Sequence, residues 1–166
     1  PGTEGGSAAY AVEEHADGTV TVTVQDLTMD PGEQESLAAK LRAAGVQTSI
    51  RNPKEGFMCA RGANAIGNTR YNINPPEPAG KNAPAGKESA AYEVEEKEEE
   101  PWSITLRPTD TFVIENIQKY KMYNAVTAFF AVEGKSQPCK PLPLLTGENH
   151  LDVSDLAWEH LNLPGE

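Results

Sequence analysis

Residues 9–27, AYAVEEHADGTVTVTVQDL, decide the fold, because apolar and polar side chains alternate on both sides of a central Asp-Gly pair. This pattern is typical of a β-hairpin whose second strand is rich in β-branched residues. A two-residue Asp-Gly loop would place Glu13 opposite Val22 and mix charge into the valine face. A three-residue loop ending at Gly18 instead pairs Val12 with Val22 and keeps one face apolar. We therefore predict a type I turn with a bulge and Gly18 at positive φ.

Working outward from the hairpin, residues 30–50 have the pattern of a helix followed by a third strand. Asp30 can accept N–H bonds at the helix start, the proline after it presets the first helical φ, and Glu33 lies at the capping-box position. Gly45 is a typical helix end, and alternation resumes after it. Residues 9–58 are thus predicted to form a strand–strand–helix–strand unit with the helix on one face of a small sheet. The apolar stripe of that helix consists of Leu37, Ala38, Leu41 and Ala44.

Periodicity is lost between residues 59 and 101, where Asn, Gly, Pro and a dense acidic run dominate. We interpret residues 59–101 as an irregular, linker-like segment. Its acidic run is interpreted as solvated, because ordered sites for hard cations need spaced oxygen ligands and a turn glycine. Residues 91–95 alternate weakly, which is compatible with an edge strand.

The strand-like periodicity resumes in residues 102–141, where three apolar runs predict a second antiparallel set of strands. The runs are Trp102 to Leu106, Thr111 to Ile117 and Ala125 to Val132. The last two can pair as a hairpin. Because Phe129 and Phe130 fall on opposite faces, this hairpin is expected to contribute a central strand with both faces covered. Residues 142–166 form a tail in which a helix start and a short apolar set predict a C-terminal helix.

Taken together, these elements predict an α+β fold with antiparallel sheets and one main helix packed on one face. A long irregular acidic loop and a short C-terminal helix complete it. Residues 1–8 are expected to be a tag or linker remnant, since the chain opens on a Gly-rich stretch without an initiating Met. A length of 166 residues suits one compact domain overall.

The charge balance restricts the classes of partner. The chain has 25 Asp and Glu against 14 Lys and Arg, for a net charge of −11. Such a surface repels phosphate, so nucleic acid and anionic lipid are not expected as partners. The apolar stretches are far shorter than the roughly 20 residues that cross a bilayer.

The residue patterns contain no catalytic signature or cofactor motif, so we predict a non-enzymatic protein without a cofactor. No metal site is predicted either, because the spacing of the candidate ligands in the tail matches no two-His helical motif. Those candidates are His150, Asp152, Asp155 and His160. Arg61, Arg70 and Tyr71 could line a partner surface, although an ordinary surface loop explains them equally well.

The two cysteines, Cys59 and Cys139, each stand just outside an apolar, strand-like run. A bridge between them would close a loop long enough for about 4 kcal/mol of stabilisation in the chain-entropy model, and it would indicate an oxidising compartment. Two free thiols in a cytosolic protein are the alternative.

Two stretches carry a resemblance to a known family: AYAVEEHADGTVTVTVQDL and DPGEQESLAAKLRAAGVQTSI, residues 9–27 and 30–50. They resemble the extracellular part of actinobacterial single-pass membrane proteins often found beside extracytoplasmic-function sigma factors. That family has a hairpin, a D-P-x-x helix, a cysteine, an I-T-I/L-R-P strand and a final strand leading to P-C. The last three elements match Cys59, Ile104 to Pro108 and Pro138-Cys139.

The resemblance spans residues 9–141 and is more specific in the first half than in the second. It implies a disulfide between Cys59 and Cys139 and an exported domain tethered by an N-terminal transmembrane helix outside this sequence. The role of the family is generally unassigned.

We therefore predict a non-enzymatic extracytoplasmic binding or sensing domain of a membrane-anchored protein at the cell surface, with a link to sigma-factor signalling as one option. Its partner would be an unknown protein or small molecule, and its oligomeric state is left open. The alternatives are a secreted inhibitor or structural interaction module acting through the acidic loop, and, third, a small hydrolase.

Overall fold

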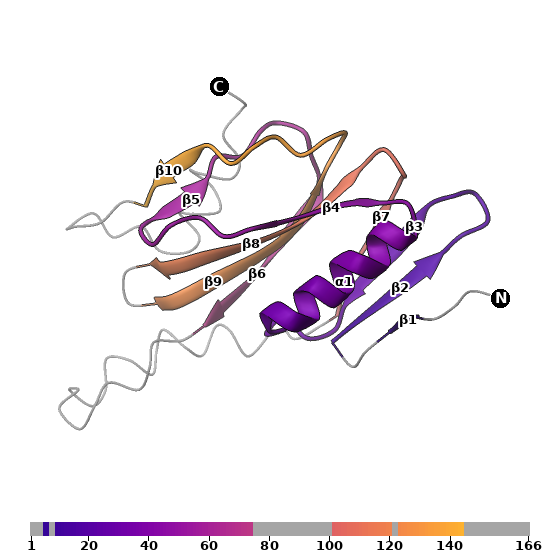
Figure 1. The fold of residues 1–166 in the computed structure, drawn as a ribbon, viewed down its shortest axis with the longest axis horizontal. Coiled ribbons are helices and arrows are strands. Elements are labelled where there is room, and N and C mark those ends of the chain that lie inside the picture. The colour runs from indigo at the N-terminus through magenta and orange to yellow at the C-terminus, as the bar shows by residue number, and fades with distance from the viewer. Residues whose placement is uncertain (1–4, 7–8, 75–100, 121–122, 145–166) are drawn as a thin grey trace.

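The computed structural model describes residues 5–6, 9–74, 101–120 and 123–144 (Figure 1). Within these ranges the chain forms one helix and ten strands, arranged in three sheets. In chain order the elements are β1 (Gly5–Gly6), β2 (Tyr10–Glu14), β3 (Val20–Val24), α1 (Pro31–Ala43), β4 (Gln47–Arg51), β5 (Phe57–Cys59), β6 (Ala65–Asn74), β7 (Trp102–Leu106), β8 (Thr111–Tyr120), β9 (Tyr123–Val132) and β10 (Pro141–Pro143). The α+β prediction with one main helix is confirmed for these residues.

The predicted hairpin is formed by β2 and β3, in the register that keeps the valines on one face. Val12 lies opposite Val22, and Gly18 has a φ of 89°. Valines of β3 are buried and alternate with threonines that are half-exposed. The threonine hydroxyls form hydrogen bonds with side chains of β7, as between Thr21 Oγ1 and Thr105 Oγ1, which are 2.8 Å apart. One face of this sheet therefore enters the core while the other carries a row of hydroxyl groups.

Helix α1 begins and ends where its capping residues predict. The Asp30 carboxylate accepts the N–H of Glu33 at 2.8 Å, which satisfies one of the free donors of the first turn. Gly45 follows the helix with a φ of 90°, a conformation that glycine adopts at little cost. Leu37 and Leu41 are buried within the core.

The main sheet has the strand order β4-β8-β9-β6. The β8–β9 hairpin is antiparallel as predicted, and β9 is a central strand whose Phe129 and Phe130 are buried on opposite faces. One pair, β4 with β8, is parallel, with Ile50 opposite Ile114. The sheets of the described residues are thus antiparallel except for this pair.

The assignment of strands to sheets was wrong for β4 and β7. We expected β4 to join the first hairpin and β7 to join the second antiparallel set. Instead β4 pairs with β8, and β7 pairs with β3 so that Val22 lies opposite Ile104 (Figure 1). Alternation specifies which face of a strand is buried, but several strands here share the same alternation, so it does not specify the partner.

The segment predicted to be irregular, residues 59–101, contains a strand. Residues 65–74 form β6, an edge strand with a register shift between Ile66 and Arg70. Its Asn and Gly content opposes strand formation, but backbone hydrogen bonds to the apolar strand β9 outweigh that preference. Gly5 and Gly6, expected in a remnant, likewise pair with β2.

Three other expectations lie outside the described residues. These are the edge strand at residues 91–95 and the C-terminal helix, together with the candidate metal ligands of the tail.

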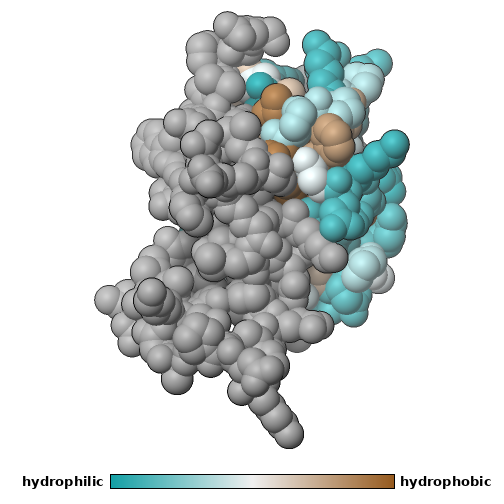
Figure 2. All heavy atoms as spheres, turned by 90° about the vertical axis from the view of Figure 1, so that its left-hand side faces the viewer, coloured by the Kyte–Doolittle hydropathy of each residue, from teal (hydrophilic) through white to brown (hydrophobic). Residues whose placement is uncertain are grey.

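The main core lies between the first sheet, α1 and one face of the main sheet. Its largest members are aromatic and aliphatic side chains from all three: Tyr10, Leu37, Leu41, Trp102, Leu106, Phe112, Ile114 and Phe129. The other face of the main sheet carries a smaller apolar cluster, which consists of Val113, Ala128, Phe130 and Val132 with Tyr71 packed against it. Figure 2 shows mostly hydrophilic residues on the described surface in that view, with a few apolar ones toward the top, as expected for a net charge of −11.

A partly buried pair of amide side chains connects α1 to the main sheet. The side chains of Gln34 and Asn116 exchange two hydrogen bonds, at 2.9 and 2.8 Å, and Asn116 also donates to Asn52 at 3.0 Å. Gln34 is only 3% exposed, so this pairing satisfies polar groups that burial would otherwise leave without partners.

Candidate functional site

Cys59 and Cys139 form a disulfide, with Cα atoms 4.9 Å apart and a sequence separation of 80. The predicted bridge is confirmed. Strands β5 and β10 pair antiparallel beside it, with Cys59 opposite Pro141. We call this two-stranded sheet, together with the disulfide, the cap. The cap contacts the main sheet through β5 and β8.

A buried carboxyl group lies where the cap meets the main sheet. Glu115, at the middle of β8, is fully buried, and its Oε2 accepts the backbone N–H of Cys59 at 3.1 Å. Strand alternation places Glu115 on the face opposite Ile114, which belongs to the main core. The carboxyl group therefore holds the cap at one of the two half-cystines.

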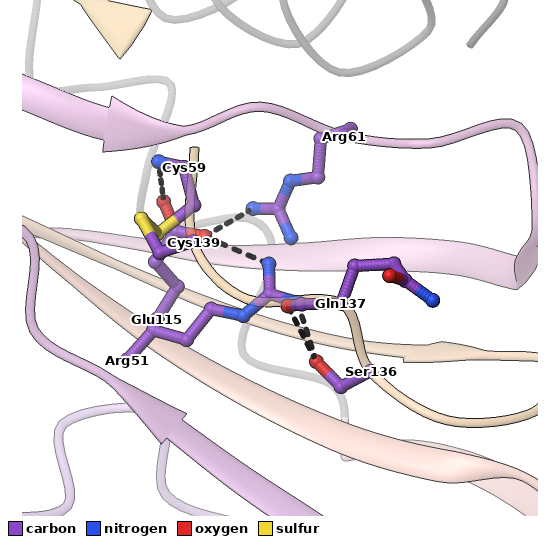
Figure 3. Close-up of a disulfide and its surroundings, with 7 residues drawn as sticks. All are labelled: Arg51, Cys59, Arg61, Glu115, Ser136, Gln137 and Cys139. Carbon is purple, nitrogen blue, oxygen red and sulfur yellow. Dashed lines mark hydrogen bonds and ion pairs between the residues drawn. A yellow bond between two sulfur atoms is a disulfide. The ribbon is translucent and has the colours of Figure 1, made fainter. Parts of the chain in front are cut away.

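Two arginines approach the same carboxyl group. Arg51 Nη1 lies 3.9 Å and Arg61 Nη2 lies 3.6 Å from Glu115 Oε1 (Figure 3). Arg51 reaches it because the parallel register of β4 and β8 sets these two residues side by side. Arg61 reaches it from the segment that follows β5, two positions after the half-cystine.

Arg51 also binds the chain that leads to the second half-cystine. Its Nη2 donates to Ser136 Oγ at 2.5 Å and to the carbonyl of Gln137 at 3.1 Å. Glu115 and Arg51 together thus fasten both chain segments that the disulfide joins. The disulfide and the hydrogen bonds of these two charged side chains therefore hold the same two segments of the chain.

An aromatic ring lies beneath the guanidinium groups. The Arg61 Cζ lies 3.4 Å from the ring centroid of Phe130, and the Arg51 Cζ lies 5.8 Å from it. Both distances are within the range of cation–π attraction, which is stronger for a desolvated cation. Phe130 therefore stabilises Arg61 from the side of the sheet.

Arg61 is buried with its hydrogen-bonding capacity unused. Its side chain is 4% exposed, and its Nε, Nη1 and Nη2 meet no hydrogen-bond acceptor among the described residues. Burial lowers the pKa of Arg61, and the charge of Glu115 opposes that shift. Burial likewise lowers the pKa of Arg51. Arginine stays protonated at neutral pH, so two cations face one carboxyl group in this cluster.

The structure separates the three residues considered for a partner surface. Arg61 is buried under the cap, and Tyr71 lies on the same face of the main sheet, close enough for the Arg61 charge to lower its pKa. Arg70 lies on the opposite face of β6, because it pairs with Phe129 whereas Tyr71 pairs with Ala128. Only Arg61 and Tyr71 are brought together.

Sequence reasoning missed Glu115 and Arg51. In a chain with 25 acidic residues, any one carboxyl group carries little information. A usable signal exists, however, in the run TFVIENI, where Glu115 takes the inward position between Val113 and Ile117. A charge at an inward position of an apolar strand requires a buried partner, and this requirement points to a cluster of this kind.

The alkaline stability of the protein is expected to depend on Tyr71. Burial raises its pKa from 10.0 to about 12, against smaller lowering effects of Arg61 and Thr69. Unfolded tyrosine loses its proton first, so the stability contributed by neutral Tyr71 is complete below about pH 10 and is lost as the pH rises through 12. We expect a loss of about 1 kcal/mol by pH 11.

Urea unfolding of the oxidised protein between pH 9 and 11 measures this loss. Tyr71→Phe should flatten the decline with pH. An equally steep decline in the variant would contradict the assignment to Tyr71.

The described residues include no group of three or more His, Cys, Asp or Glu side chains placed to hold a metal ion. A membrane-spanning helix, which must be long and apolar, is also not found among them. The arrangement at the cap is suited to binding an acceptor group through Arg61. Comparison with protein-family models, with curated proteins and with solved structures found no match to this chain.

Proposed function

We propose that this chain is a non-enzymatic, extracytoplasmic binding or sensing domain of a membrane-anchored protein. The observation that carries the proposal is the Cys59–Cys139 disulfide, which joins the end of β5 to the segment that leads into β10. Structural disulfides persist in oxidising compartments and are rare in the cytosol, where thiols are kept reduced. The resemblance of residues 9–50 to ectodomains of actinobacterial membrane proteins supports the same location, with sigma-factor signalling as the associated process.

The cluster under the cap supports a binding role. Arg61 is buried without an acceptor, which costs free energy in a protein that binds nothing there. A bound ligand with an acceptor group would offset this cost. A domain of this kind would report the ligand through the position of the cap.

Intact cells of the source organism test the location, using the full-length gene product with an epitope tag. Cells are quenched in acid, and their protein is then redissolved in denaturant at neutral pH with N-ethylmaleimide, which reacts with the thiolate form of any free cysteine. Parallel intact cells are treated with a protease that does not cross membranes. We expect Cys59 and Cys139 to resist alkylation and the domain to be cleaved from outside. A cytoplasmic protein serves as the protected control.

Alkylation of both thiols in quenched cells, together with protection from the protease, would overturn the proposal. It would return the protein to the cytosolic alternative. A variant with Cys59→Ser and Cys139→Ser calibrates the alkylation signal, because it has no thiol to react.

A further inference from the structure

We propose that Arg61 forms, with the nearby Tyr71 hydroxyl, a binding site for the carboxylate group of a small organic acid. The site lies on the face of the main sheet beneath the cap. This inference rests on the binding role proposed above, but not on the cellular location.

The Arg61 side chain has unused hydrogen-bonding capacity. A guanidinium group carries five N–H donors, and burial without acceptors removes their bonds to water. Here Nε, Nη1 and Nη2 are all buried without an acceptor among the described residues. Figure 3 shows the nitrogen paired with Glu115 on the side of the disulfide, whereas the other terminal nitrogen is directed, in this view, toward the Arg51 guanidinium. This donor thus faces the side of the cluster where a second cation lies, and not Glu115.

The cluster also carries one more positive than negative charge. Arg51 and Arg61 share one carboxyl group, and they do so at 3.9 and 3.6 Å rather than at hydrogen-bonding distance. A singly charged anion beside Arg61 would neutralise the cluster. A doubly charged anion would instead leave an excess of negative charge next to Glu115. The cluster therefore favours a monoanion over a phosphate dianion.

The donor groups at the site match a carboxylate in geometry and polarity. The guanidinium is planar and matches a planar carboxylate with two parallel hydrogen bonds. Its neighbours on the sheet face are the charged Glu115 and Arg51 and the apolar Phe130, whose ring centroid lies 3.4 Å from the Arg61 Cζ. The buried Tyr71 hydroxyl, whose pKa of about 12 keeps it protonated at neutral pH, supplies a second donor type. A small carboxylic acid with a short apolar body fits this combination.

Titration with sodium acetate tests the site. Oxidised protein labelled with ¹⁵N is titrated at constant pH and constant ionic strength, with sodium chloride replaced by acetate, and the arginine Nε–Hε signals are followed by NMR. We expect a saturable shift of the Arg61 signal, assigned from its absence in Arg61→Gln. Sodium phosphate in place of acetate should give a weaker shift.

Thermal unfolding in the same buffers gives a second readout. At ten times the dissociation constant, acetate should raise the Tm by roughly 3–6 °C, the shift expected for a ligand that binds only the folded state. Tyr71→Phe should weaken acetate binding about tenfold while leaving the Arg61 signal in place. Arg107→Gln, which removes the same charge from an exposed side chain, is the matched control and should bind acetate like the wild-type protein.

Three outcomes would overturn the site. They are the absence of a saturable shift at Arg61, equal shifts with acetate and chloride, and equal loss of binding in Arg107→Gln. If Arg61→Gln fails to fold, Arg61→Lys supplies the assignment, because lysine keeps the charge and also lacks an Nε–Hε group, and Tyr71→Phe remains the second test. A failed titration would leave the location experiment untouched, so the two proposals can fail separately.

Discussion

Replacement of both half-cystines by alanine is expected to lower the free energy of unfolding by about 4 kcal/mol. The bridge joins residues separated by 80 positions, so its loss restores a large loop entropy to the unfolded chain. The folded state is weakened as well, because the Cys59 N–H that Glu115 accepts lies in the segment that is released. Urea unfolding followed by tryptophan fluorescence measures the loss.

Reductant provides the control for this prediction. It should shift the wild-type transition toward that of the double variant and leave the double variant unchanged. A loss below about 1 kcal/mol in the double variant would mean that the cap does not depend on the bridge for its stability.

Glu115→Gln should lower the free energy of unfolding by about 3–5 kcal/mol, measured by urea unfolding at pH 7. The substitution keeps the size of the side chain but leaves Arg51 and Arg61 buried without their shared counter-charge. Removal of one partner of a buried ion pair is costly for this reason. The effect should far exceed that of an exposed acidic residue.

Glu133→Gln is the matched control, because Glu133 is 65% exposed and pairs with an exposed Arg107. It should leave stability almost unchanged. The double variant Glu115→Leu with Arg61→Met should lose less than the sum of the single losses, since it removes charge from both sides of the pair. Equal losses in Glu115→Gln and Glu133→Gln would contradict a buried role for Glu115.

Local features of the fold were predictable from the sequence because they depend on neighbouring residues. The hairpin register follows from the valine alternation, and the ends of α1 follow from Asp30 and Gly45. The partners of β4 and β7 were not predictable, since their selection depends on contacts far along the chain. Strand β6 was missed because its Asn and Gly residues are unfavourable in strands. The segment forms a strand through its backbone pairing with β9.

The candidate site likewise has one part that was predictable from the sequence and one part that depends on distant contacts. The disulfide was predictable from two isolated cysteines with the support of a family resemblance, and the resemblance itself stays a prediction. The cluster of Glu115 with Arg51 was not predictable, because the two residues are brought together by the parallel pairing of β4 and β8. Arg61 was noticed, but its burial follows from the position of the cap, which no local pattern indicates.

The interleaving of strands from the two ends of the chain has a consequence for how the protein forms. Each sheet contains at least one strand from beyond residue 100: β3 pairs with β7, β4 with β8, β5 with β10 and β6 with β9. Folding therefore depends on contacts of high sequence separation, a topology associated with slow rates. During synthesis, the first 74 residues emerge with strands of all three sheets and complete none of them. The decisive event is the arrival of the β8–β9 hairpin, after which both larger sheets can close around one core.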